Sequence, residues 1–153
     1  MTRRHFEDLV EGSVETFGPR TITREEIVAY AAEYDPQPMH LDEEAAKQTL
    51  LGGLAASGWH LCCFMFRMTY DGFIRDSASL GSPGVEEMKW LKPVRPGTAL
   101  TLRVTVLDKR VSKSRPDMGI ARLLCELVDE KGQPLTQQIA TMLIGVRAPG
   151  AAQ

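Results

Sequence analysis

The second half of the chain alternates apolar and polar residues with a period of two, which is the pattern of half-buried β-strands. The alternation is strict from Leu100 to Val106 and returns from Leu123 to Leu127. Asp129 to Gly132 then supplies the residues of a hairpin turn before a last strand around Gln137 to Val146. With a further segment from Val85 to Leu91, the pattern predicts about four antiparallel strands.

The first half begins with a strand and then follows the helical period. Thr23 and Glu26 have the spacing of a capping box, which starts a helix. Apolar residues then recur at i, i+3, i+4 and i+7, so this helix should be amphipathic and end near Tyr34. The acidic residues 42–44 open a second, short helix. The segment from Ala55 to Tyr70 is apolar on nearly every face, which predicts a helix buried all round.

Strands and helices are segregated along the chain, which favours an α+β fold over a parallel, doubly wound sheet. A curved antiparallel sheet wrapped around one long buried helix accounts for every predicted element. The 153 residues of the chain match the size of one domain. We assign this domain to residues 1–147 and expect residues 148–153 to form a disordered C-terminal tail.

Composition and charge narrow the expected partners. Hydrophobic residues make up 43% of the chain, and the formal net charge is −2. This balance gives no overall attraction for nucleic acid or for an anionic membrane surface. The longest apolar stretch, Leu54 to Met68, is shorter than the ~20 residues that cross a bilayer. The N-terminus also lacks the apolar region of a signal peptide. We therefore expect neither nucleic acid nor a membrane as a partner.

The cysteine pattern points to a reducing compartment. Cys62 and Cys63 are neighbours in the long apolar run and are expected to be buried as small hydrophobic residues. With Cys125 they form neither a disulfide framework nor a zinc-binding spacing. No metal site is predicted, and a cytoplasmic location is the expectation.

The segment from Asp35 to His40 carries the strongest chemical signal in the chain. Pro36 and Pro38 stop the preceding helix and stiffen the turn, so a carboxylate and an imidazole can be held together at low entropic cost. Two such groups that hydrogen-bond one water can divide acid and base work near neutral pH. The alternative from the residues alone is a polar loop in which Asp35 caps a turn and His40 packs by chance.

A glycine-rich segment, residues 52–60, leads into the predicted buried helix. Free backbone N–H groups at the start of a helix can bind an oxyanion. Gly58 would let a ligand carbonyl approach the backbone closely, although tight packing alone would also call for a glycine there. His60 is expected to be a satisfied helix histidine. Trp59, with other apolar residues of this helix, lines either an apolar ligand tunnel or the core.

Four positive charges occur within residues 109–115, and Lys113 and Arg115 are among them. Such a run can pair with the phosphates of a nucleotide-containing ligand. The alternative is a solvated end of a β-hairpin.

Taken together, these motifs resemble the MaoC-like acyl dehydratases and (R)-specific enoyl-CoA hydratases, which share the hotdog fold. The family pattern places an Asp, a Pro, a His and an Asp where this chain has Asp35, Pro38, His40 and Asp42. Gly58 follows His40 by 18 residues, as in the family. The segment from Lys89 to Gly97 and the loop at 111–116 are also similar to family members. The resemblance covers the chain from about Phe6 to Val146.

The resemblance implies syn hydration of a trans-2-enoyl thioester, or the reverse dehydration of an (R)-3-hydroxyacyl thioester. Asp35 and His40 would hold the water, and the Gly58 N–H would bind the thioester oxygen. No metal or redox cofactor is implied, and coenzyme A enters only as part of the acyl-CoA substrate. The chain is expected to form a homodimer or a higher homo-oligomer.

The expected substrate-binding residues include two departures from the family pattern. Gln37 stands near the place of an asparagine, and Ser57 replaces a histidine before the helix glycine. The remaining candidates are Trp59, Lys113 and Arg115, the last two for the phosphates of coenzyme A.

Two other functions remain open at this point. A hotdog acyl-CoA thioesterase commonly carries an Asp or Glu on the central helix, but residues 55–70 contain neither. A non-catalytic acyl-CoA-binding domain would keep an acyl pocket and would not require an oriented Asp–His pair.

Overall fold

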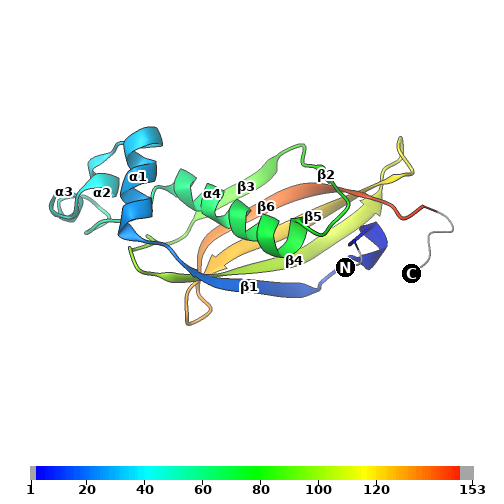
Figure 1. Ribbon diagram of the computed structural model, residues 1–153, viewed down its shortest axis with the longest axis horizontal. Coiled ribbons are helices and arrows are strands. Elements are labelled where there is room, and N and C mark those ends of the chain that lie inside the picture. Colours follow the sequence, from blue (N-terminus) through cyan, green and yellow to red (C-terminus); the bar gives the residue numbers. More distant parts are fainter. Residues whose placement is uncertain (1–2, 149–153) are drawn as a thin grey trace.

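The computed structural model describes residues 3–148, which form one antiparallel sheet wrapped around a helix (Figure 1). The strands run in the order β1-β4-β5-β6, and β2 and β3 both pair with the outer edge of β6. Their bounds are β1 Val14–Thr21, β2 Ser79–Gly81, β3 Val85–Trp90, β4 Ala99–Val111, β5 Met118–Val128 and β6 Pro134–Gly145. Apart from Ala148, the predicted tail lies outside the described residues.

Helices α1 to α4 lie on one side of this sheet and at one end of it, while the short helix η1 lies beside the N-terminus at the other end (Figure 1). Helix α4 crosses the concave face, while α1 to α3 gather beside its first turn, at the end away from the two termini. The bounds are η1 Phe6–Asp8, α1 Arg24–Tyr34, α2 Pro38–Leu41, α3 Glu43–Lys47, α4 Gly58–Thr69 and the π-helical turn η2 Tyr70–Ile74. The predicted α+β class, with a curved antiparallel sheet around a central helix, is confirmed.

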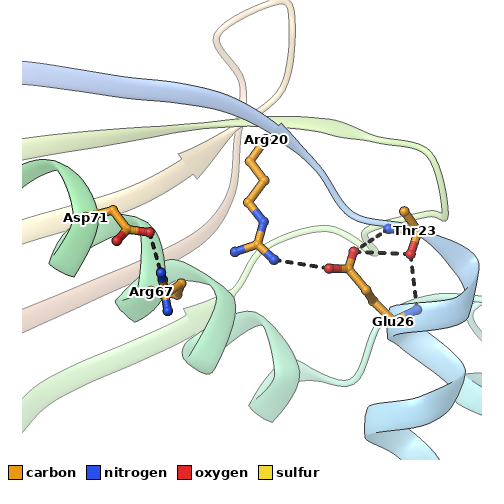
Figure 2. A network of polar contacts seen from close by, with 5 residues as sticks. All are labelled: Arg20, Thr23, Glu26, Arg67 and Asp71. Atoms are coloured by element: carbon orange, nitrogen blue, oxygen red, sulfur yellow. Dashed lines mark hydrogen bonds and ion pairs between the residues drawn. The ribbon is translucent and has the colours of Figure 1, made fainter.

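The capping box at the start of α1 is confirmed (Figure 2). The Thr23 hydroxyl accepts a hydrogen bond from the Glu26 N–H at 3.1 Å, and the Glu26 carboxylate accepts one from the Thr23 N–H at 2.9 Å. Arg20, at the end of β1, pairs with the same carboxylate. These contacts fix the position of the first turn of α1 relative to β1. They therefore help to place the other end of α1, where Asp35 is the C-cap residue.

The core lies between α4 and the concave face of the sheet. Alternate residues of β4, such as Leu102 and Val104, point into it, as the period of two predicted. Met65 of α4, Leu127 of β5 and Ile144 of β6 are fully buried against them. Burial of these side chains holds α4 in a fixed position, which in turn fixes its N-terminus at the site described below.

Helix α4 differs from its prediction in length and in burial. It begins at Gly58, because residues 55–57 run extended along the segment after β3, where the Ala56 N–H donates to the Val94 carbonyl. It is also not buried all round: Trp59 is 62% exposed and Phe66 59%, and Tyr70, which follows in η2, is 43% exposed. Apolar composition alone could not separate burial within the chain from burial against another molecule.

Strand β2, Cys63 and His60 also differ from what the sequence predicted. Strand β2 was not predicted, because three residues are too few to show alternation. Cys63 is exposed, whereas Cys125 is buried in the core and burial raises the pKa of its thiol to about 11. His60 is buried, but its Nδ1 has no hydrogen-bond partner among the described residues, so the prediction of a satisfied histidine was wrong.

The cytoplasmic location inferred from the cysteines stays a prediction. Within residues 3–148, no helix combines the length and the apolar character needed to cross a membrane.

Candidate active site

Asp35 and His40 come together because the chain turns sharply between α1 and α2. Asp35 ends α1, where its N–H still donates to the Ala31 carbonyl, and its backbone is non-helical at φ −150° and ψ 68°. Pro38 then begins α2, since proline fits the first position of a helix. His40 lies on this four-residue helix and turns back toward Asp35. Residues 38–41 were predicted only as part of a rigid turn, because so short a helix shows no periodicity.

The Asp35 carboxylate receives polar contacts from three side chains. The Ser57 hydroxyl donates to Oδ2 at 2.6 Å, and the Gln37 amide donates to Oδ1 at 2.7 Å. His40 Nε2 lies 3.4 Å from Oδ2. Desolvation by itself would raise the pKa of Asp35, but the two hydrogen bonds and the nearby imidazole outweigh it and hold the pKa of this carboxyl below its usual value. Asp35 is therefore a carboxylate at neutral pH.

His40 is buried, and its orientation is set by a backbone carbonyl. Its Nδ1 lies 2.7 Å from the carbonyl oxygen of Ala55. Because a carbonyl oxygen only accepts hydrogen bonds, Nδ1 must carry the hydrogen of this bond. The other ring nitrogen, Nε2, is thereby left as the atom that can gain or lose a proton, and it faces Asp35.

The N-terminus of α4 adds backbone donors to the same place. Ser57 is the residue before the helix, but its hydroxyl bonds Asp35 and does not cap α4. In residues 3–148 the Gly58 N–H takes part in no hydrogen bond, as expected for the first residue of a helix. The helix dipole places partial positive charge at this point, so an oxygen that gains negative charge would be stabilised there.

Gly58 is required by a close contact within the protein. A Cβ atom at this position would lie 2.4 Å from the indole ring of Trp90, which packs directly against the glycine. The indole Nε1 also donates to the Gly58 carbonyl oxygen at 2.9 Å. The close approach that the sequence assigned to a ligand is therefore made by Trp90, and it holds the start of α4 against strand β3.

These groups open into one pocket of about 340 Å³. Asp35, His40 and Gly58 lie in its wall, and Trp59 and Trp90 meet edge to face, with their ring centroids 5.5 Å apart. The lining residues that close the other sides come from the segment after β3 and from residues 51–56. A carboxylate, an imidazole nitrogen and a free backbone N–H thus face one partly apolar cavity.

Gly58→Ala should destabilise the protein and disturb the pocket. Forcing a methyl group against the Trp90 ring should lower the free energy of unfolding by about 1–3 kcal/mol, as for other overpacked sites. Thermal unfolding of the variant measures this loss. In a Trp90→Leu background, which leaves room for the methyl group, the same change should cost clearly less. Equal costs in the two backgrounds would contradict the assigned contact.

The structure brings six of the eight predicted site residues together. Gln37 and Trp59 line the pocket with the three groups above. Ser57 is fully buried and contacts Asp35, so it does not open into the pocket itself.

Lys113 and Arg115 lie elsewhere in the chain. They belong to the turn between β4 and β5, at the end of the sheet opposite α1 to α3 (Figure 1). The Arg115 guanidinium pairs there with Asp117 at 2.8 Å. Within a single chain, these two charges are not part of the Asp35–His40 site.

Two groups of the site were not predicted from the sequence. Trp90 had been noted only as part of a strand motif, and the Ala55 carbonyl had not been considered. The tertiary fold brings the Ala55 carbonyl to His40 and Trp90 to Gly58, and no local sequence pattern indicates either contact. Among residues 3–148, no three His, Cys, Asp or Glu side chains gather in a group that could hold a metal ion.

Comparison with known proteins relates these features to one family. A sequence model described as the MaoC like domain matches residues 5–124. Uncharacterized protein YdeM of Bacillus subtilis (strain 168) is 33% identical over 111 residues, which cover 72% of this chain and 77% of that protein.

Solved structures show the same architecture. The MaoC-like dehydratase from Rhodospirillum rubrum is 35% identical, with a TM-score of 0.86 over 94% of this chain and 98% of that one. An (R)-hydratase from A. caviae involved in PHA biosynthesis is 22% identical, with a TM-score of 0.69 over 89% of this chain and 97% of that one. The second likeness concerns the fold alone.

Proposed function

Since this chain belongs to the MaoC-like domain family and has the hotdog fold, we propose that it catalyses reversible hydration of an acyl thioester. The proposed reaction is syn addition of water to a trans-2-enoyl-CoA, which gives an (R)-3-hydroxyacyl-CoA. The observation that carries this proposal is the approach of Asp35 Oδ2 and His40 Nε2 to 3.4 Å in the wall of one pocket. The dehydratase name of the Rhodospirillum rubrum relative supports the reaction class.

The geometry favours Asp35 as the base and His40 as the acid in hydration. Asp35 is ionised at neutral pH, and His40 Nε2 lies 3.4 Å from Asp35 Oδ2 as the ring nitrogen able to transfer a proton, since Nδ1 already donates to Ala55. Asp35 then takes a proton from water as the water oxygen bonds to C3 of the enoyl group. His40 Nε2 gives its proton to C2, and a proton passing from Asp35 to His40 restores the starting state. Dehydration follows the same steps in reverse.

The start of α4 would stabilise the charge that develops during this addition. As the C3–O bond forms, electrons move from the C2–C3 double bond toward the thioester oxygen. The free Gly58 N–H and the positive end of the helix dipole lie in the same pocket and can bind that oxygen. Removal of one such donor typically costs about 10²–10³-fold in kcat. Metal and redox cofactors have no step in the proposed reaction, and the coenzyme A thioester is the substrate.

We further propose that the protein acts as a homodimer. The exposed side chains of Trp59, Phe66 and Tyr70 form an apolar strip along α4 and the start of η2. Phe66 and Tyr70 also line a second, mainly apolar cavity of about 710 Å³ beside β3, whose outer edge pairs with no other described strand. A second copy that pairs through this edge would cover the strip. Light scattering should therefore give at least twice the mass of the chain; the mass of a monomer would contradict the proposal.

A panel of trans-2-enoyl-CoA substrates tests the function. Loss of the enoyl absorbance with formation of the (R)-3-hydroxyacyl product is the expected result. Release of free thiol from acyl-CoAs without hydration would favour the thioesterase instead. Tight binding of acyl-CoA with no turnover of any kind would favour the non-catalytic binding domain. Either of the last two results would overturn the proposal.

A further inference from the structure

The segment from Leu51 to Ser57, here called the strap, forms part of the pocket wall and is held by Arg95. Arg95 lies in the turn between β3 and β4, outside the pocket. Its Nη1 donates to the Gly53 carbonyl at 2.6 Å and to the Leu54 carbonyl at 3.3 Å, and its Nη2 donates to the Leu51 carbonyl. One guanidinium therefore binds three of the carbonyl groups that precede Ala55.

The N–H groups of the strap are held from the other sides. Glu43, at the start of α3, accepts from the Leu54 N–H at 3.1 Å. The Ala55 N–H donates to the Met39 carbonyl at 3.2 Å, and the Ala56 N–H donates to the Val94 carbonyl at 2.9 Å. The strap thus lies between α2 and α3 on one side and the turn before β4 on the other, with bonds to both.

Gly53 makes this arrangement possible. A Cβ atom at position 53 would lie 3.2 Å from both Arg95 Nη1 and Glu43 Oε1. These two charged groups therefore approach the strap at a place where the chain has no side chain. Because Arg95 and Glu43 come from two separate segments and both approach Gly53, together they fix the backbone of the strap at this residue.

The strap ends in groups that the proposed reaction uses. The Ala55 carbonyl, one residue after the carbonyls bound by Arg95, receives the hydrogen bond from His40 Nδ1. We infer that Arg95 is a positioning residue: it fixes the Ala55 carbonyl and thereby the ring orientation of His40 and the hydrogen on Nδ1. As an element of catalysis this role rests on the proposed hydratase function, whereas its effect on the His40 ring does not.

The planar guanidinium, with its five N–H donors, suits this role. The ammonium group of a lysine has three donors on a flexible stem, so it can bind some of the same carbonyls with less constraint. Methionine has a similar length and no donor. Arg95→Lys and Arg95→Met therefore remove the hydrogen-bond donors in part and in full. Arg3→Met is the matched control, because Arg3 is exposed and its guanidinium also donates to a backbone carbonyl, that of Ser77.

The first measurement separates kcat from KM in hydration of crotonyl-CoA. Arg95→Met should lower kcat by about 10–100-fold, since a misplacement of about 1 Å can cost 10²-fold. KM should change less than about threefold, because Arg95 does not line the pocket. Arg95→Lys should recover part of kcat, and Arg3→Met should match the wild type.

The second measurement uses nitrogen-15 NMR of the histidine rings, with His40 assigned by the loss of its signals in His40→Ala. In the neutral ring of the wild type, the hydrogen should reside on Nδ1 alone. Arg95→Met should give a mixture of the two neutral forms, and Arg95→Lys should lie between. If Arg95→Met does not fold, Arg95→Lys must still show both intermediate effects.

Three results would overturn the inference. These are an unchanged kcat, a lower kcat with an unchanged His40 spectrum, or a failure of Arg95→Lys to alter either measurement. If the wild type shows no hydratase activity, the proposed function fails by itself, and the NMR comparison still decides whether Arg95 positions His40.

Discussion

Asp35→Asn should lower kcat for crotonyl-CoA hydration by about 10³-fold or more while leaving the fold intact. Asparagine keeps the shape of the side chain, and its oxygen can still accept the hydrogen bond from Ser57. It cannot take a proton from water at neutral pH, so the addition loses its base. Initial rates of enoyl absorbance loss measure the effect, and circular dichroism checks the fold.

The Asp35 carboxyl also sets the expected pH dependence of the hydration rate. Activity requires the carboxylate, so it should be lost as the pH falls through the depressed pKa of Asp35. Ser57→Ala removes a hydrogen bond that lowers this pKa, so the acid limb of the rate profile should move to higher pH. Asp117→Asn, which alters an exposed carboxyl paired with Arg115, should leave rate and profile unchanged. Wild-type turnover in Asp35→Asn would remove Asp35 from the mechanism.

His40→Ala should lower kcat by a similar factor, about 10³-fold or more, because it removes the proton donor for C2 of the substrate. It also removes the charge that faces Asp35, so the pKa of Asp35 should rise toward its usual value. The buried ring leaves a space at the pocket wall, and some loss of stability should accompany the kinetic effect.

A second variant separates these two effects. His40→Gln fills more of the space and can donate to the Ala55 carbonyl, but it cannot transfer a proton at neutral pH. It should restore stability and leave kcat low. His5→Ala, which changes a half-buried residue of the N-terminal segment outside the pocket, should behave as the wild type. Recovery of kcat by His40→Gln would show that His40 has only a packing role.

The main elements of the fold could be predicted because their signals are local. The period of two in β4 and β5 and the capping box at Thr23 each depend on residues that are close in sequence. Helix α2 and strand β2 escaped prediction because four and three residues carry no periodicity. The outer face of α4 was assigned wrongly because an apolar sequence does not say which molecule covers it.

The candidate site was predictable in part for the same reason. Asp35 and His40 lie on either side of a proline-stiffened turn, so their convergence follows from six residues of sequence. The contact of Trp90 with Gly58 spans 32 positions and depends on where β3 meets α4. The bonds from Arg95 to the strap span 41 to 44 positions. Such contacts are set by the register of the sheet, which no local motif encodes.

The central claim is that Asp35 and His40 act as a unit on one water molecule. A double-mutant cycle on kcat/KM for crotonyl-CoA hydration, with Asp35→Asn, His40→Ala and the double variant, tests it most directly. If the pair works as a unit, the double variant should be about as slow as the slower single variant. If the two losses multiply, or if either single variant keeps the wild-type rate, the two residues do not share one water and the account is contradicted.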